Sequence, residues 1–281
     1  MDSEVIVPLI VGFVSDLMFT AKISNVARHG GYRMEWIEKA VDLGPVEELG
    51  KQKPGEAVDG RTGQLFQTLT DWQPALLVFD LSNTAVPWQQ WIPRLKTSPA
   101  TRRIPILCFG SHVNVEVMTE AKRLGADAVL ARSRFTSDML NLFQKYARVP
   151  NLDAIQSACQ EPLAELARRG IDLFNQGKYY ECHDELEEAW RQDEGDGRSL
   201  YQGILQTGIA LYQIQRGNYR GAVKMLLRLR QWLDPLPDVC RGVNVAALRR
   251  NVAAIHKSLS TLGSDKIEAF DWQIVQPILY A

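Results

Sequence analysis

The chain has 281 residues, of which 46% are hydrophobic and 23% are charged, and its formal net charge is −1. Single domains usually run to roughly 100–200 residues, so this length suits two hydrophobic cores. The balanced charge excludes the overall basic field of a typical nucleic-acid-binding protein.

The first apolar run, residues 5–14, contains Pro8 and Gly12. It is too short to cross a bilayer, which needs about 20 apolar residues. The run instead predicts a strand, and the chain is expected to be a soluble, cytoplasmic protein.

Residues 10–147 alternate between strand and helix patterns. Continuous apolar runs, typical of strands buried on both faces of a sheet, predict strands at 10–14, 32–37, 75–79, 104–109 and 128–130. Helices are predicted at 17–29, 64–69, 88–95, 113–124 and 136–146. Residues 42–63 are rich in glycine, proline and charge and predict an exposed loop. The alternation indicates an α/β fold with a parallel five-stranded sheet.

In an open parallel sheet, the working crevice lies beyond the carboxyl ends of the strands. The predicted strand ends are followed by Asp16, Asp80, Ser111, His112 and Arg132. The runs PALLVFDLS, IPILCFGSH and GADAVLARSRF resemble the third, fourth and fifth strands of the response-regulator receiver domain. This resemblance, over about the first 148 residues, implies a flavodoxin-like fold. It also implies a phosphoacceptor at Asp80 and a Mg²⁺ held by Asp16 and Asp80.

Three positions depart from the receiver pattern. A receiver has two acids after its first strand to help hold Mg²⁺, whereas this chain has Ser15 and Asp16. The switch hydroxyl of the fourth strand is replaced by glycine, with Ser111 one place later, and the lysine of the fifth strand by Arg132. An arginine fork does not substitute freely for a compact ammonium group. Two hypotheses stay open: a receiver phosphorylated on Asp80, or a pseudo-receiver used for docking or dimerisation.

Residues 148–151, Arg-Val-Pro-Asn, predict a boundary between a receiver-like domain (1–148) and an all-α domain (149–281). Helices are predicted at 160–174, 179–191, 198–215, 219–233 and 243–262. Laying Gly177 on Gly217, a shift of 40 residues, aligns two helical hairpins of the tetratricopeptide type.

His183 and Glu187 lie one turn apart on the second of these helices, at positions that are apolar in the aligned hairpin. The spacing suits a pair of metal ligands or an acid/base pair. Buried polar groups need partners, and Gln202 and Gln206 are the predicted ones, with Asp184 pointing elsewhere. The alternative is a hydrogen-bonded His–Glu pair that only fixes helix packing.

The runs FNQGKYYECHDELEEAW and LYQGILQTGIALYQIQRGNYRGAVKMLL are similar to a bacterial helical family known as domain of unknown function 309. The similarity covers roughly residues 165–235, and Asp184 stands where the family tends to have glutamate. It implies a helical fold but no reaction. The candidate pocket residues that it implies are Glu181, His183, Glu187, Trp190, Gln202, Gln206 and Asn218.

Charge is segregated in this half of the chain. Residues 181–196 include eight acids and one base, whereas residues 216–230 include five bases and no acid. A basic face can bind nucleic acid or an acidic partner. Here the acidic helix offers an internal counterpart, so a solvated face is favoured over nucleic-acid binding.

The four cysteines are far apart and form no Cys-x-x-Cys pair, so neither a zinc site nor a disulfide framework is expected. P-loop, GxSxG and HExxH motifs are absent from the sequence. The predicted function is cytoplasmic signalling or regulation, with a helical module that binds a protein partner or small ligand. The alternative is a metal-assisted hydrolase or transferase that uses His183, Glu187 and Gln206. The sequence leaves open whether the protein is a homodimer.

Overall fold

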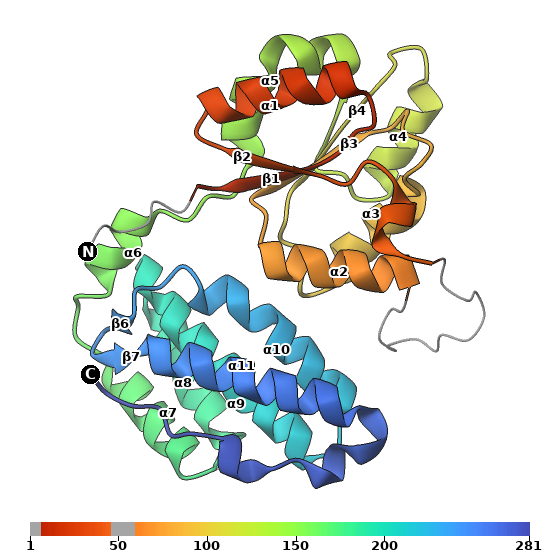
Figure 1. Ribbon diagram of the computed structural model, residues 1–281. Coiled ribbons are helices and arrows are strands. Elements are labelled where there is room, and N and C mark those ends of the chain that lie inside the picture. The colour runs from red at the N-terminus through yellow and green to blue at the C-terminus, as the bar shows by residue number, and fades with distance from the viewer. Residues whose placement is uncertain (1–6, 46–59) are drawn as a thin grey trace. The chain divides into compact units, whose positions relative to one another are not determined.

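The computed structural model describes residues 7–45 and 60–281 of the chain. The chain divides into two compact units, unit 1 (Met1–Val149) and unit 2 (Pro150–Ala281), each shown in Figure 1. Most of the predicted loop at 42–63, and the start of the apolar run at 5–14, lie outside the described residues. Within the described residues, no helix is both long and apolar enough to span a membrane.

Unit 1 contains a parallel five-stranded sheet in the order β2-β1-β3-β4-β5. Its strands are β1 (Leu9–Phe13), β2 (Arg33–Trp36), β3 (Leu76–Asp80), β4 (Ile106–Gly110) and β5 (Ala128–Ala131). The three inner strands, β1, β3 and β4, are buried throughout, which explains their continuous apolar sequences. This strand order is that of the flavodoxin-like fold, as the sequence predicted.

Helices cover both faces of the sheet (Figure 1). They are α1 (Leu17–His29), α2 (Gly60–Trp72), α3 (Trp88–Thr97), α4 (Val115–Arg123) and α5 (Arg132–Tyr146), with a 3-10 turn η1 (Ala40–Leu43) after β2. Helices α1 and α5 pack on one face, and α2, α3 and α4 on the other. Successive strand residues point to opposite faces, so Ile10 contributes to the first core and Val11 to the second.

Unit 2 is mainly helical. Its helices are α6 (Leu152–Ala158), α7 (Glu165–Asn175), α8 (Glu181–Gln192), α9 (Ser199–Gln215), α10 (Tyr219–Leu233) and α11 (Val245–Leu262). The 3-10 turns are η2 (Asp196–Arg198), η3 (Ser264–Ala269) and η4 (Trp272–Ile274). Helices α7 and α8 form one hairpin, α9 and α10 form the next, and α11 packs against α10.

The two hairpins turn in the same way. Gly177 and Gly217 both adopt left-handed backbone conformations, with φ of 77° and 66°. In each turn the residue after the glycine donates its N–H to the carbonyl five residues earlier, Lys178 to Leu173 and Asn218 to Gln213. This is the Schellman end of a helix, in which glycine avoids the steric penalty of a side chain.

One prediction for unit 2 is wrong. The helix predicted at 160–174 begins at Glu165, and a separate helix, α6, precedes it. The predicted helical fold of this domain is confirmed, and the structure adds to it a short hairpin of β6 (Val239–Cys240) and β7 (Val243–Asn244) that the sequence did not predict. Strands of two residues are too short to show any periodicity.

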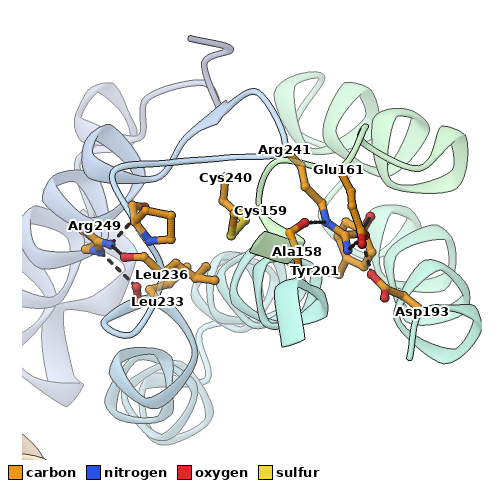
Figure 2. The surroundings of a disulfide bond; sticks show 11 residues. Ala158, Cys159, Glu161, Asp193, Tyr201, Leu233, Leu236, Cys240, Arg241 and Arg249 are labelled. Carbon is orange, nitrogen blue, oxygen red and sulfur yellow. Dashed lines mark hydrogen bonds and ion pairs between the residues drawn. A yellow bond between two sulfur atoms is a disulfide. The ribbon is translucent and has the colours of Figure 1, made fainter. Parts of the chain in front are cut away.

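A disulfide joins Cys159, just after α6, to Cys240 in β6 (Figure 2). The two residues are 81 positions apart in the sequence, and their Cα atoms are 4.4 Å apart. The prediction of no disulfide pairing therefore fails for this pair, because sequence spacing does not reveal cysteines that only the tertiary fold brings together. Cys108 and Cys182 are free and buried.

Candidate functional site

Asp80 lies at the carboxyl end of β3, in the centre of the sheet, and is 4% exposed. Its Oδ1 accepts hydrogen bonds from the Ser82 backbone N–H at 2.9 Å and from the Ser82 hydroxyl at 2.5 Å. Its Oδ2 accepts a charge-assisted hydrogen bond from Arg132 Nη2 at 2.6 Å. Arg132 Nη2 also lies 2.8 Å from the Ser82 hydroxyl oxygen. We call these three residues the Asp80 cluster.

The rings of two phenylalanines hold the Arg132 guanidinium in place. The carbon Cζ lies 5.1 Å from the ring centroid of Phe19 and 5.3 Å from that of Phe109. Cation–π contacts of this kind favour a planar guanidinium over a lysine ammonium. Arg132 begins α5 directly after β5, so its backbone position is also set by the sheet.

Asn83 fixes the loop that carries Ser82. The buried Asn83 amide donates to the Glu38 carbonyl at 3.0 Å and to the Phe13 carbonyl at 3.4 Å. Its Oδ1 accepts from the Ala85 N–H at 3.1 Å. The loop after β3 is thereby tied to the ends of β1 and β2, which keeps Ser82 beside Asp80.

The other predicted receiver residues, Asp16, Ser111 and His112, have surroundings different from those of the Asp80 cluster. Asp16 is exposed and caps α1 by accepting from the Phe19 N–H at 3.1 Å. Ser111 is half-buried and His112 is exposed, both in the loop after β4.

No group of residues in the described parts of the chain confirms the Mg²⁺ site that the receiver resemblance implies. Mg²⁺ prefers carboxylate, carbonyl and water oxygens as ligands. Both oxygens of Asp80 already accept hydrogen bonds, and the cation beside them is Arg132. In residues 7–45 and 60–281, no group of three or more His, Cys, Asp or Glu residues is placed to hold a metal.

His183 and Glu187 lie on α8 as predicted, and both are partly exposed. The His183 Nε2 lies 3.8 Å from Glu187 Oε2, and its Nδ1 lies 3.1 Å from Asp184 Oδ1. The expectation that Asp184 points elsewhere is therefore wrong. Glu187 also pairs with Arg191 at 2.9 Å, so its charge is shared along the helix surface.

Gln206 lies on α9, is 9% exposed, and its Oε1 has no hydrogen-bond partner among the described residues. Gly203, three residues earlier, packs so closely on α10 that an added Cβ would lie 2.3 Å from Leu233 Cδ2. Residues three apart share a helix face, so Gln206 faces α10 too. By contrast, Gly208 packs against Cys182 of α8. The pocket of His183, Glu187 and Gln206 stays a prediction.

The remaining pocket candidates differ in their surroundings. Trp190 is covered by the Arg198 guanidinium, 5.4 Å from the ring centroid. Asn218 caps α10 by accepting from the Gly221 N–H at 3.0 Å, which is a structural role. Glu181 is exposed, and Gln202 is partly buried on α9.

Sequence reasoning missed a buried arginine beside the disulfide (Figure 2). The Arg241 side chain is 4% exposed, and its Nη2 pairs with Glu161 at 2.9 Å while its Nη1 pairs with Asp193 at 2.5 Å. It also donates to the Tyr201 hydroxyl and, at 3.2 Å, to the Ala158 carbonyl. Burial lowers the pKa of this guanidinium, but Tyr201 and Asp193 outweigh burial and raise the pKa overall. The only sequence signal was the glycine after Arg241, a turn marker.

Comparisons with known proteins match this chain to a helical family of unknown function and to receiver domains. A family model described as Domain of unknown function (DUF309) matches residues 167–225. An uncharacterized protein of Aquifex aeolicus (strain VF5) is 28% identical over 87 residues, which are 31% of this chain and 26% of that protein. The uncharacterized protein YpuF of Bacillus subtilis (strain 168) is 41% identical over 49 residues, 17% of this chain and 28% of YpuF. The matches therefore span only about a quarter of each relative.

Receiver domains are among the solved structures that are similar to this chain. The receiver domain of a sensor histidine kinase from Pseudomonas aeruginosa PAO1, which has a magnesium ion in its active-site cleft, is 11% identical with a TM-score of 0.38. That match covers 50% of this chain and 96% of the other. A CheY-like receiver domain from Methanospirillum hungatei JF-1 is 12% identical, with a TM-score of 0.37 and coverage of 50% and 92%. Both resemblances predicted from the sequence thus recur in the comparisons.

Proposed function

We propose that this protein is a signalling or regulatory adaptor in which unit 1 is a pseudo-receiver that docks a partner without being phosphorylated. Unit 2 is then the helical module that binds a protein partner or small ligand. The observation that carries this proposal is the Asp80 cluster, in which Arg132 and Ser82 engage both oxygens of the carboxylate.

The chemistry of phosphorylation supports the same conclusion. An aspartyl phosphate forms when a carboxylate oxygen attacks phosphorus and the donor's leaving group departs, with Mg²⁺ neutralising the phosphoryl oxygens. Both Asp80 oxygens accept hydrogen bonds, Oδ1 from Ser82 and Oδ2 from Arg132, and these bonds make either oxygen a weaker nucleophile. The second acid that would help hold the metal is Ser15 in this chain, and Asp16 caps α1.

The test is intact-mass analysis after incubation with acetyl phosphate and Mg²⁺. We expect no phosphoryl adduct on the wild-type chain and none on Asp80→Asn, which keeps the side-chain shape but removes the nucleophile. A double variant, Ser15→Asp with Arg132→Lys, restores two features of the receiver pattern and serves as the positive comparison. An adduct on the wild-type chain that disappears in Asp80→Asn would refute the proposal.

A further inference from the structure

A pocket of about 390 Å³ lies in unit 1 between the end of α1 and the start of β2. Its lining consists of Val7, Ser24, Arg28, Tyr32, Arg33 and Met34. Val7 precedes β1 and Arg33 is the first residue of β2, whereas Asp80 is the last residue of β3. Because the strands are parallel, the pocket lies at the amino edge of the sheet, opposite the Asp80 cluster.

A glycine turn sets the positions of the two arginines. Gly31, with φ of 78°, follows the end of α1, and the Tyr32 N–H donates to the Ala27 carbonyl at 2.9 Å. This Schellman end reverses the chain between Arg28, in the last turn of α1, and Arg33 (Figure 1). A backbone hydrogen bond thus fixes the turn that joins the two residues.

The lining carries two positive charges and no negative charge. Arg28 and Arg33 are exposed, and neither guanidinium forms an ion pair with a carboxylate among the described residues. The Tyr32 phenol stays neutral, because burial raises its pKa. Ser24 lies one turn before Arg28 on the same face of α1, so its hydroxyl is a further hydrogen-bond donor in the lining. The pocket therefore favours an anion.

The lining suits a phosphate monoester better than other anions. Arginine pairs with phosphate oxygens through its planar fork, and a phosphate monoester carries a charge of about −1.5 to −2 at pH 7 with three acceptor oxygens. Two guanidinium groups match that charge, whereas one carboxylate would balance only one of them. Val7 and Met34 give the pocket an apolar side, which suits an apolar ester group. The volume falls in the range of small-molecule sites, about 300–1,000 Å³.

We propose that this pocket binds a small organic phosphate monoester. We call it the arginine pocket, formed by the six lining residues. Arg28 and Arg33 pair with the phosphate oxygens, Ser24 donates a further hydrogen bond, and the ester group packs against Val7 and Met34. Binding is noncovalent and lies away from Asp80. The inference goes beyond the proposed function and does not depend on whether Asp80 accepts a phosphoryl group.

Isothermal titration calorimetry of the full chain tests this site, with phenyl phosphate as the probe. We expect a single saturable site with a dissociation constant of about 1 mM or below. Arg28→Gln and Arg33→Gln should each weaken binding at least about tenfold, because each removes a charge-assisted pair with the phosphate. Lys22→Gln, which removes an exposed charge of α1 outside the lining, is the matched control and should bind like the wild-type chain.

The probe can be divided into its parts. Inorganic phosphate and phenol should each bind more weakly than phenyl phosphate, because each supplies only half of the contacts. Benzoate, a monoanion with the same ring, should also bind more weakly. Amide chemical shifts of the nitrogen-15-labelled chain give the location: the changes caused by phenyl phosphate should centre on residues 24–34 and leave Asp80, Ser82 and Arg132 unchanged.

Four outcomes would overturn the proposal. They are no saturable binding, an equal loss of affinity in Lys22→Gln, benzoate binding as tight as that of phenyl phosphate, and shift changes centred on the Asp80 cluster. Circular dichroism checks the fold of each variant. If a glutamine variant fails to fold, lysine takes its place at the same arginine, and loss of the planar fork should still weaken binding severalfold.

Discussion

At the scale of single residues, the Asp80–Arg132 pair makes a sharp energetic prediction. Removing one partner of a fully buried ion pair costs about 3–5 kcal/mol. The Arg132 side chain is 37% exposed, so solvent screening reduces that cost. We expect Arg132→Met to lower the free energy of unfolding by about 1–3 kcal/mol, measured by urea denaturation. The loss that Arg132→Met causes should be smaller in a chain that already carries Asp80→Asn.

Arg134 provides the control for this measurement. It is exposed on the same helix, α5, and its replacement by methionine should change stability by less than about 0.5 kcal/mol. Equal losses for Arg132→Met and Arg134→Met would mean that the ion pair contributes nothing specific to Asp80.

The cysteines give a second prediction at this scale. Cys108 and Cys182 are buried, and burial raises the pKa of both thiols, with nearby acids adding to the effect. We expect no rapid reaction with a thiol reagent at pH 8 in the native chain, two reactive thiols after unfolding without reductant, and four after reduction. Four reactive thiols in the unreduced, unfolded chain would contradict the disulfide.

The raised pKa also has a consequence for stability. Burial and the charges of Glu181 and Asp184 raise the pKa of the Cys182 thiol to about 12 in the folded chain. The unfolded chain therefore releases this proton at lower pH than the folded chain, from about pH 8.5. The stability that the neutral, buried Cys182 thiol contributes is therefore complete below about pH 8.5 and is lost as the pH rises toward 12. Urea denaturation at pH 7 and at pH 10 should detect this loss.

At the scale of elements, the two helical hairpins should respond alike to the same change. A Cβ added at Gly177 or Gly217 would meet no atom within 4 Å, so only backbone strain opposes alanine there. We expect Gly177→Ala and Gly217→Ala each to destabilise the chain by about 1 kcal/mol in urea denaturation. Gln215→Ala, exposed at the end of α9, should be nearly neutral. Clearly unequal losses at the two glycines would argue against equivalent turns.

Arg241 sits in the two-residue turn between β6 and β7 with φ of 53°, a conformation that favours glycine. Relief of this backbone strain by Arg241→Gly should by itself raise the free energy of unfolding by about 1 kcal/mol. The loss of a buried network with Glu161, Asp193 and Tyr201 costs more, so we expect a net loss of about 2–4 kcal/mol in thermal or urea unfolding. Arg241→Lys keeps the charge but not the forked guanidinium, so its stability should lie between those of the wild-type chain and Arg241→Gly. A stabilised Arg241→Gly would show that the network has little net value.

Elements with a full local signal could be predicted from the sequence. Helix α10 spans Tyr219–Leu233, as predicted, because Asn218 caps its start and prolines follow its end. Because the carboxyl ends of parallel strands lie at the same edge of a sheet, the predicted strands likewise placed Asp80 and Arg132 at one edge. Their ion pair, the disulfide and the β6–β7 hairpin could not be predicted, since each depends on contacts between distant positions or on strands too short for periodicity.

At the scale of the whole molecule, each unit has its own hydrophobic core, and the disulfide lies wholly within unit 2. Closing a loop of 81 residues restricts the unfolded chain and, by loop-closure entropy, stabilises the folded one by about 4.5 kcal/mol at most. Reduction should therefore weaken unit 2 and leave unit 1 unchanged. Arg241 bonds to Ala158 and Glu161 on either side of Cys159, so unit 2 should stay folded, although less stable, in reductant.

Amide hydrogen exchange read by mass spectrometry separates the two units in one sample of the full chain. With reductant, we expect faster exchange in α6, β6 and β7, which the disulfide joins directly, and a general loss of protection across residues 150–281 under mild urea. Peptides from residues 7–45 and 60–149 should exchange at the same rate with and without reductant. A Cys159→Ser, Cys240→Ser variant is the matched control, and all of its peptides should exchange at the same rate with and without reductant. Loss of protection in the sheet of unit 1 on reduction would mean that the two units unfold as one cooperative body.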